Sequence, residues 1–227
     1  MMEVLVTGAG RGIGLELVRQ LLARGDSAIA VVRKPAPTLG ELPGGDRLRV
    51  ELCDVGDEKE IARLAKTLDG LALDAVINNA GVWGGEHQRL GDFDAAEAIR
   101  TYQIDALGPL LVSLALLPHL RRGTTKKLLH ITSGMGSIGD NTSGGFYAYR
   151  MAKAALNMAS RSLAVDLKSE GIASAVINPG WVQTDMGGRG ANTTVGDSVR
   201  GILTQLAALS LETSGRFLNW KGGELLW

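Results

Sequence analysis

The chain has 227 residues, of which 45% are hydrophobic and 21% charged, with 24 basic and 24 acidic side chains. This composition allows a buried core and leaves no bulk charge that would attract a nucleic acid, so we expect no nucleic-acid partner. The longest nearly apolar stretch, residues 106–117, is too short to span a bilayer, and Met1-Met2-Glu3 lacks the basic start of a secretory signal. We therefore expect a cytoplasmic protein with no membrane partner. The lone Cys53 cannot form an internal disulfide, and we expect it to be buried in a strand.

Apolar runs rich in Val, Ile and Ala alternate with helical patterns along the whole chain. The runs predict buried strands at residues 4–7, 28–32, 48–52, 75–78, 128–132 and 173–177, with a weaker seventh at 216–218. Helices are predicted near residues 12–24, 57–68, 92–121 with a break at Gly108-Pro109, 146–169 and 195–208. Strands that alternate with helices through right-handed crossovers predict an α/β fold, a doubly wound parallel sheet of about seven strands with helices on both faces. Because no linker interrupts this pattern, we expect one domain over residues 1–227.

A glycine-rich turn, residues 7–14 (TGAGRGIG), joins the first predicted strand to the first predicted helix. Glycines allow backbone amides to approach a pyrophosphate closely, and the first turn of a helix offers free N–H groups to an anion. Such a turn also occurs for structural reasons alone, but its position between a strand and a helix favours a dinucleotide site.

Tyr149 and Lys153 lie four residues apart in the predicted helix 146–169. This spacing places both side chains on one helix face, where a lysine ammonium favours the phenolate and lowers a tyrosine pKa toward the range useful for acid or base catalysis. A pair of unrelated surface residues would show the same spacing.

Two further polar groups follow predicted strands. Ser133 ends the strand at 128–132, and Asn78-Asn79-Ala80-Gly81 ends the strand at 75–78. Since ligands of doubly wound sheets bind outside the carboxyl ends of the strands, we expect these groups to share one crevice with the glycine turn. Ser137 and Ser143 are rivals to Ser133, although a strand end fixes a hydroxyl better than a glycine-rich loop does.

In this order, the motifs resemble those of the short-chain dehydrogenase/reductase family over essentially the whole chain. They are Thr7-Gly8-x-x-x-Gly12-x-Gly14, Asn78-Asn79-Ala80-Gly81, the Ser133 hydroxyl, Tyr149-x-x-x-Lys153, and Pro179-Gly180 with Thr184. The resemblance implies a Rossmann-type fold and catalytic roles for Ser133, Tyr149 and Lys153. Residues 135–141, 147–150 and 215–220 look like the subgroup that contains Sniffer-type carbonyl reductases and bacterial C-factor signalling proteins.

The end of the second predicted strand indicates which nicotinamide cofactor is bound. Arg33 and Lys34 follow this strand where an NAD site would have a carboxylate, so the sequence favours the 2′-phosphate of NADP(H). Arg11 would add a second cation, as it does in family members that prefer NADP. The alternative is that Arg33 and Lys34 are solvated loop charges.

The resemblance assigns further residues to the cofactor. It places Asp54 against the adenine amino group, Lys153 on the nicotinamide ribose, and Val182 and Thr184 near the carboxamide and phosphates. The complete set of expected cofactor-binding residues is Gly8, Arg11, Gly12, Ile13, Gly14, Arg33, Asp54, Val55, Asn79, Ala80, Gly81, Tyr149, Lys153, Pro179, Gly180, Val182 and Thr184. No bound metal is expected.

The chain departs from the family pattern at Asp105, where the fourth catalytic residue is an asparagine that serves a proton relay to the lysine. Aspartate keeps an acceptor but loses the amide donors and adds a negative charge near Lys153. Turnover is therefore slowed, or else backbone atoms carry the relay and the side chain only shapes the helix break. The sequence leaves both possibilities open.

The favoured function is an NADPH-dependent oxidoreductase that transfers hydride between nicotinamide and a small carbonyl or alcohol substrate. The alternative is a C-factor-like signalling or regulatory protein that binds NAD(P) with little turnover. Trp83, Trp181 and Met186 suggest an apolar wall for the substrate. We also expect a homodimer or homotetramer, because the two long helices carry a surplus of apolar residues, namely Leu110, Leu111, Leu114, Leu117, Leu156, Met158 and Leu163.

Overall fold

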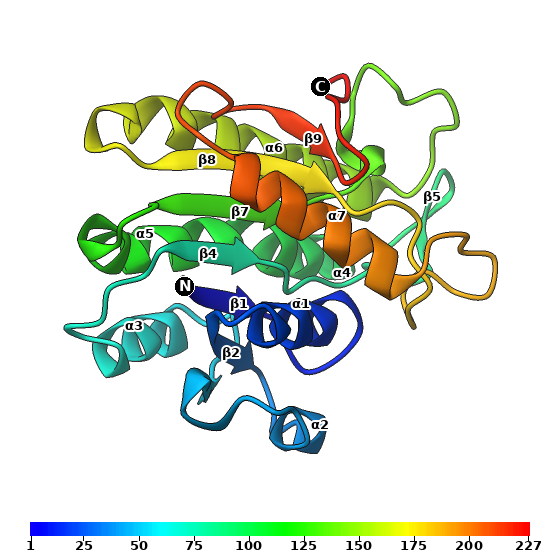
Figure 1. Ribbon diagram of the computed structural model, residues 1–227. Helices are drawn as coiled ribbons and strands as arrows, with labels where there is room; N and C mark the ends of the chain where they lie inside the picture. The colour runs from blue at the N-terminus through cyan, green and yellow to red at the C-terminus, as the bar shows by residue number, and fades with distance from the viewer.

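The computed structural model describes residues 1–227 and contains a seven-stranded sheet. Its strands are β1 (Glu3–Thr7), β2 (Ser27–Val32), β3 (Leu48–Leu52), β4 (Ala75–Asn78), β7 (Lys127–Ile131), β8 (Ala173–Asn178) and β9 (Phe217–Asn219). The strand order is β3-β2-β1-β4-β7-β8-β9, and every neighbouring pair is parallel (Figure 1). The chain therefore folds as the predicted Rossmann-type α/β domain, and the order reverses between β1 and β4, where such folds bind ligands.

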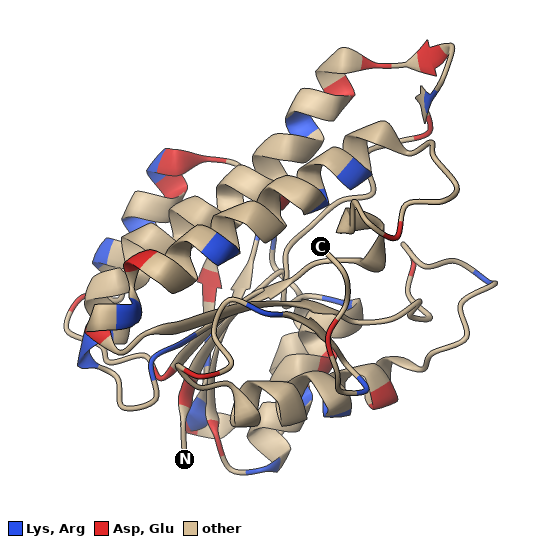
Figure 2. Cartoon of the chain, turned by 90° about the horizontal axis from the view of Figure 1, so that it is seen from above, with Lys and Arg blue, Asp and Glu red and all other residues tan.

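Helices cover both faces of the sheet. They are α1 (Gly12–Ala23), the short α2 (Pro37–Gly40), α3 (Glu58–Thr67), α4 (Ala95–Tyr102), α5 (Gly108–Arg122), α6 (Tyr147–Asp166) and α7 (Val195–Ala208). In Figure 1, α1 and α7 lie in front of the sheet, and α3, α4, α5 and α6 lie behind it. The view from above shows that Lys, Arg, Asp and Glu lie mostly on the outer helices and loops (Figure 2).

Alternating strand residues supply two separate hydrophobic cores. Val4, Val6, Ala28 and Ala30 pack toward α1 and α7 in a cluster of 24 buried residues. Leu5 and its equivalents in neighbouring strands pack toward α3, α5 and α6 in a second cluster of 18. Because successive strand side chains point to opposite faces, a fully buried parallel strand is apolar at nearly every position, which is why its sequence shows a continuous run.

The long helical region Ala95–Arg122 is interrupted as the sequence predicts, although the form of the interruption is more specific. A π-helical turn, Gln103–Leu107, separates α4 from α5, and Gly108 and Pro109 begin the second helix. Pro109 has no N–H and its ring crowds the carbonyl of residue 105, so a regular helix cannot continue through this point. By length and composition Ala95–Arg122 could cross a membrane, but 56% of its most apolar window is buried inside the protein, as in a core helix.

Four local details differ from the sequence predictions. A small antiparallel hairpin, β5 (Gln88–Arg89) and β6 (Asp92–Phe93), occupies the loop after β4, and α2 was not anticipated. The prediction that a helix begins at residue 92 is wrong, because the Asp94 carboxylate caps α4 by accepting hydrogen bonds from the Ala96 and Glu97 amides. Cys53 is buried as expected, but it lies one residue beyond β3.

Candidate active site

The carboxyl ends of β1 and β4 are joined by side-chain hydrogen bonds. The Thr7 hydroxyl accepts hydrogen bonds from the amides of Asn79 (3.0 Å) and Ala80 (3.1 Å). The Asn79 side-chain amide in turn donates to the carbonyl oxygens of Thr7 (2.9 Å) and Gly8 (3.3 Å). These contacts hold the glycine turn against the segment after β4, as the shared-crevice prediction requires.

The glycines of the turn are there for steric reasons that the structure shows directly. Gly8 has a φ of +66°, and a side chain there would meet the Ala80 backbone. A Cβ on Gly14 would lie 2.2 Å from the Gly8 carbonyl oxygen, so only glycine lets α1 start this close to β1. No side chain caps the N-terminus of α1, whereas Asp57 and Asp94 cap α3 and α4. The first amides of α1 are therefore free to bind an anion, as a pyrophosphate site requires.

The residues expected near the adenosine 2′ position lie on the exposed rim of the same turn. Gly10 lies against the segment after β2, since a Cβ added to it would contact Val32 and Ala36. Arg33 and Lys34, which follow Val32, are exposed and form no ion pair. Arg11 instead pairs with Asp185, 2.8 Å away, a partner that the sequence analysis did not identify.

Asp54 lies just after β3, where its carboxylate accepts a hydrogen bond from the Gly56 amide (2.9 Å). Asp57 caps α3 as expected, and Glu60 reaches back to the Asp54 amide (2.7 Å). Val55 is buried beneath α5, because its carbonyl lies where a Cβ on Gly108 would be. This packing fixes the loop that would face the adenine.

The residues expected near the nicotinamide end follow β8. Gly180 has a φ of +84°, and its amide donates to the Asn178 side chain (3.2 Å). Pro179 accepts a hydrogen bond from Ser198, and Val182 is buried in a bridge to Thr193. The Thr184 methyl lies 3.3 Å from the position of a Cβ on Gly12, so this loop reaches the glycine turn.

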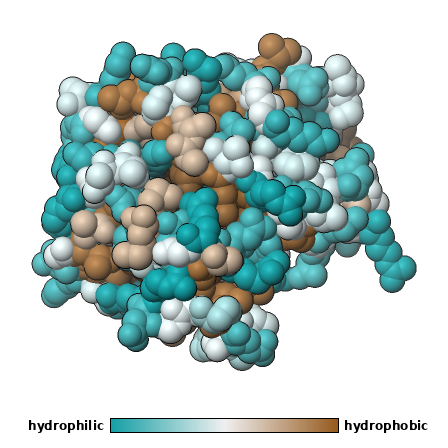
Figure 3. Space-filling view, in the orientation of Figure 1, coloured by the Kyte–Doolittle hydropathy of each residue, from teal (hydrophilic) through white to brown (hydrophobic).

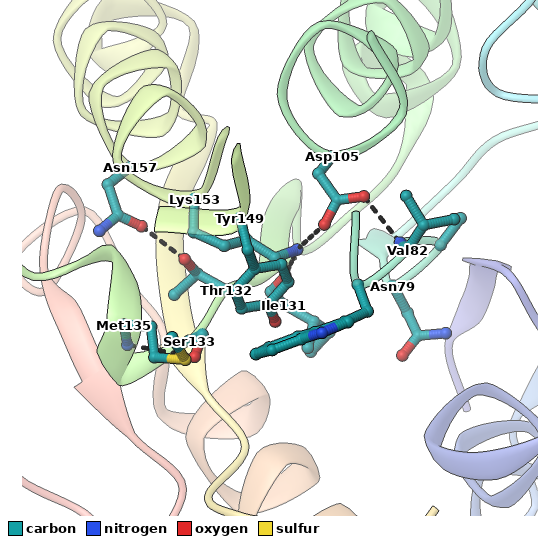
Figure 4. Close-up of polar contacts among 12 residues, drawn as sticks. Asn79, Val82, Asp105, Ile131, Thr132, Ser133, Met135, Tyr149, Lys153 and Asn157 are labelled. Carbon is teal, nitrogen blue, oxygen red and sulfur yellow. Dashed lines mark hydrogen bonds and ion pairs between the residues drawn. The ribbon is translucent and has the colours of Figure 1, made fainter. Parts of the chain in front are cut away.

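Ser133, Tyr149 and Lys153 meet at the carboxyl end of β7 (Figure 4). Ser133 accepts a hydrogen bond from the Met135 amide (3.1 Å), and its hydroxyl is near enough to the Tyr149 phenol to lower the pKa of that phenol. The Lys153 ammonium lies 5.6 Å from the centre of the Tyr149 ring and donates to the Ile131 carbonyl (3.3 Å). The rivals point elsewhere: Ser137 donates to the Trp227 carbonyl, and Ser143 accepts from Arg150. The geometry favours Ser133, whose catalytic role stays a prediction.

Asp105 is fully buried at the π-helical turn and forms an ion pair with Lys153, with 3.0 Å between Oδ2 and Nζ (Figure 4). Its other carboxylate oxygen accepts a hydrogen bond from the Val82 amide (2.7 Å). The position thus joins the segment after β4 to the lysine on α6. An asparagine of the same shape could keep the Val82 contact but would remove the charge that faces the ammonium.

The electrostatics of the site differ from the sequence expectation. Burial raises the pKa of Tyr149, and the Asp105 charge raises it further, while Lys153 and the Ser133 hydrogen bond oppose the rise without cancelling it. The expectation of a lowered tyrosine pKa is therefore wrong. Burial disfavours the charged form of Lys153, but Asp105 and Tyr149 outweigh it and raise the pKa of the ammonium above its ordinary value.

Several positioning contacts were not found from the sequence. The Asn157 side chain accepts from the Thr132 hydroxyl (2.7 Å) and donates to the Gly136 carbonyl (3.2 Å), which fixes the loop after Ser133. Its spacing of four residues from Lys153 is a signal that could have found it. Gln88 gave no such signal: it lies in the hairpin and accepts from the Tyr149 amide (2.9 Å).

The three residues suggested for a substrate wall are placed differently. The Trp83 ring packs against the Tyr149 ring, with 4.8 Å between ring centres, so Trp83 does border the site. Trp181 and Met186 are about half exposed in the loop after β8, where the Trp181 indole N–H donates to the Gly187 carbonyl. Only Trp83 is held in contact with the tyrosine.

Comparison with known proteins agrees with this arrangement. Residues 2–193 match the family model of the short chain dehydrogenases. The chain belongs to the short-chain dehydrogenase family. It is 53% identical over 155 residues to the C-signal of Myxococcus xanthus, which covers 68% of this chain and 93% of that protein.

Two solved structures are similar over the full length. The carbonyl reductase Sniffer of D. melanogaster has a TM-score of 0.92 and 30% identity, covering 100% of both chains. The NADPH-bound carbonyl reductase from chicken fatty liver has a TM-score of 0.92 and 34% identity, covering 100% of this chain and 99% of that one. The resemblance to the Sniffer and C-factor subgroup is thereby confirmed, and membership of the family supports oxidoreductase activity.

Proposed function

We propose that this member of the family is an NADPH-dependent reductase of small carbonyl compounds. The observation that supports this most directly is the meeting of Ser133, Tyr149 and Lys153 beside the glycine turn, at the carboxyl edge of the sheet. The close approach at Gly14 and the uncapped start of α1 fit a dinucleotide, and exposed Arg33 and Lys34 fit its 2′-phosphate.

In the proposed reaction, NADPH supplies the hydride that adds to the carbonyl carbon. Tyr149 donates its phenolic proton to the carbonyl oxygen, which Ser133 holds by a hydrogen bond, so the carbonyl becomes an alcohol. Lys153 then stabilises the phenolate that remains, and Asp105 keeps Lys153 charged. A phenol is protonated at neutral pH at its ordinary pKa, and the raised pKa of Tyr149 leaves it so, as the acid role requires.

Loss of NADPH absorbance with a panel of ketones and aldehydes tests the proposal. We expect turnover of several carbonyl compounds by the unaltered protein, and loss of turnover in Tyr149→Phe with cofactor binding retained. If the unaltered protein binds NADPH but turns over no member of the panel, the reductase proposal fails.

The similarity to the C-signal favours a second candidate, a signalling protein that binds the cofactor with little turnover. The two candidates differ in what Tyr149→Phe does. A signalling activity that needs only the bound cofactor would survive this substitution, whereas one that depends on reduction would be lost with it.

We also propose that the chain forms a dimer or tetramer through α4, α5 and α6. Exposed large apolar residues gather on these helices and on the π-helical turn between α4 and α5, and none lies on α1 or α7. They are Ile99, Tyr102, Leu107, Leu114, Tyr147, Met151, Met158 and Val165. The α1–α7 face is mostly hydrophilic with small separate hydrophobic areas (Figure 3). Of the residues expected to contribute, Leu156 and Leu163 are instead buried in the chain's own core. Light scattering at micromolar concentration should show a dimer or larger, and a monomer would contradict the proposal.

A further inference from the structure

Four side chains from three separate segments form a continuous series of contacts that starts at Tyr149, in which the aromatic rings are tilted against one another. The Trp83 ring centre lies 4.8 Å from that of Tyr149 and 5.2 Å from that of Phe146. The Arg89 guanidinium carbon lies 4.3 Å from the centre of the Phe146 ring. This series of contacts therefore begins at Tyr149, the proposed proton donor, and ends at the positive charge of Arg89.

The backbone under Phe146 is held in an unfavourable conformation. Phe146 has φ +51° and ψ +42°, the left-handed region, and it follows Gly144 and Gly145, which are also left-handed. Glycine adopts this conformation freely, but a bulky side chain does so at a cost and is held there by its surroundings. Such strain gathers at functional sites. Here it brings the phenyl ring between Trp83 and Arg89.

Arg89 has no partner for its charge within the chain. Its side chain is exposed on the hairpin and takes part in no ion pair or hydrogen bond, while Asp92, opposite it in the β5–β6 register, bonds to His87. Arg150, the other arginine at this edge, differs, because it donates to the Met135 carbonyl and the Ser143 hydroxyl. The N–H groups of the Arg89 guanidinium are thus free to bind a ligand, while its central carbon lies over the Phe146 ring.

We propose that the site takes carbonyl substrates that carry a carboxylate, and that Arg89 is the residue that binds this carboxylate. The inference rests on the proposed reductase function. A guanidinium binds a carboxylate through two parallel hydrogen bonds, and contact with an aromatic ring restricts where the guanidinium lies. Because Trp83 and Phe146 separate Arg89 from Tyr149, the carboxylate must be joined to the carbonyl by an apolar spacer that crosses both rings. Compounds with adjacent carbonyl and carboxylate groups are too short.

The test compares a long-chain ω-oxo alkanoate with its methyl ester, and uses pyruvate as the short acid. In the unaltered protein we expect the KM for the long acid to be about tenfold or more below that for the ester, which corresponds to about 1.4 kcal/mol. Arg89→Gln should raise the KM of the acid to that of the ester and leave kcat unchanged, because only binding is lost. Arg89→Lys should lie between the two.

Arg100→Gln is the matched control, since Arg100 is exposed on α4, likewise forms no ion pair, and carries the same charge. It should leave both KM values unchanged. The inference is overturned if the ratio of the KM values of the long acid and its ester is the same in Arg89→Gln as in the unaltered protein. It is also overturned if the protein prefers pyruvate to its methyl ester as strongly as it prefers the long acid to its ester.

Calorimetric binding of the long acid and the ester, with and without NADPH, separates failure of the inference from failure of the reductase proposal. If neither compound is reduced but the acid binds more tightly than the ester only when Arg89 is present, the reductase proposal fails and the carboxylate site stands. If the acid and ester bind equally, the carboxylate site fails whether or not turnover occurs.

Discussion

Two ion pairs of similar length border the candidate site, and they differ in exposure. Lys153 and Asp105 are 3.0 Å apart with side chains 6% and 0% exposed. Arg11 and Asp185 are 2.8 Å apart with side chains 82% and 80% exposed. Water screens the exposed pair, so its net contribution is about 0–1 kcal/mol, whereas loss of one buried partner leaves an uncompensated charge.

The difference shows that distance alone does not tell what an ion pair does. The buried pair shifts the pKa values at the site, because Asp105 raises the pKa of Lys153 and that of Tyr149. The exposed pair can separate at little cost, so Arg11 can leave Asp185 for a more highly charged phosphate. Buried charges should therefore control chemistry and stability, and exposed charges should control the choice of cofactor.

The largest effect is expected from a substitution among the buried residues of the site. Tyr149→Phe removes the proposed proton donor without touching the glycine turn, and loss of general acid catalysis lowers kcat on the order of 100-fold to 10,000-fold. Steady-state kinetics measures this, and fluorescence titration should give an NADPH affinity close to that of the unaltered protein. Full activity in Tyr149→Phe would overturn the assignment of the acid.

A buried histidine next to the site should make stability depend on pH. His130 is fully buried between Asn78 and Ser174, and burial, assisted by the Lys153 charge, lowers its pKa to about 4. The pKa of a histidine in the unfolded chain is about 6.5. At pH values between this pKa and the folded one, the unfolded chain binds a proton that the folded chain does not, so stability falls as the pH falls. About 3 kcal/mol of the free energy of unfolding should be lost by pH 4.

Denaturant unfolding at several pH values measures this loss. His130→Gln should remove that part of the pH dependence, whatever it does to stability at neutral pH. His87 is exposed, so His87→Gln is the control and should leave unchanged the pH dependence of stability that His130 contributes. A pH dependence that is the same in His130→Gln and the unaltered protein would show that His130 does not carry it.

A smaller effect is expected at the exposed rim. NADPH should bind at least about tenfold more tightly than NADH, which requires only about 1.4 kcal/mol from contacts with the 2′-phosphate. Arg33→Asp should narrow or invert this preference, and added salt should weaken it because the charges are exposed. Equal affinities for the two cofactors in fluorescence titrations would contradict the proposed role of Arg33.

The subtlest prediction concerns Asp105→Asn, which restores the family residue. The substitution removes the charge that raises the pKa of Tyr149, so this pKa should fall. Alcohol oxidation needs the phenolate, and its rate should then reach its plateau at a lower pH, with severalfold faster oxidation near neutral pH and unchanged cofactor affinity.

Asp185→Asn provides the exposed control for that experiment, because it removes the same charge from the rim pair. It should leave the pH profile of oxidation in place. A profile that also stays in place in Asp105→Asn would mean that backbone atoms carry the proton relay and that the carboxylate only shapes the helix break.

Sequence patterns predicted the parts of the site that depend on local geometry. The glycine turn, the four-residue spacing of Tyr149 and Lys153, and the strand that precedes Ser133 lie where the sequence patterns place them. The hydrogen-bond partners of Arg11 and Gln88 could not be predicted in this way. Their partners, Asp185 and the Tyr149 amide, are 174 and 61 residues away in the chain.

By itself, the sequence determined the seven-stranded sheet, its long helices and the family, because turn residues and hydrophobic period act over a few neighbouring residues. Only the tertiary structure decided that Asp105 pairs with Lys153, that burial reverses the expected pKa shift of Tyr149, and that Trp83 and Phe146 link Tyr149 to Arg89. Desolvation and contacts between aromatic rings depend on which distant segments pack together. No local pattern in the chain encodes that packing.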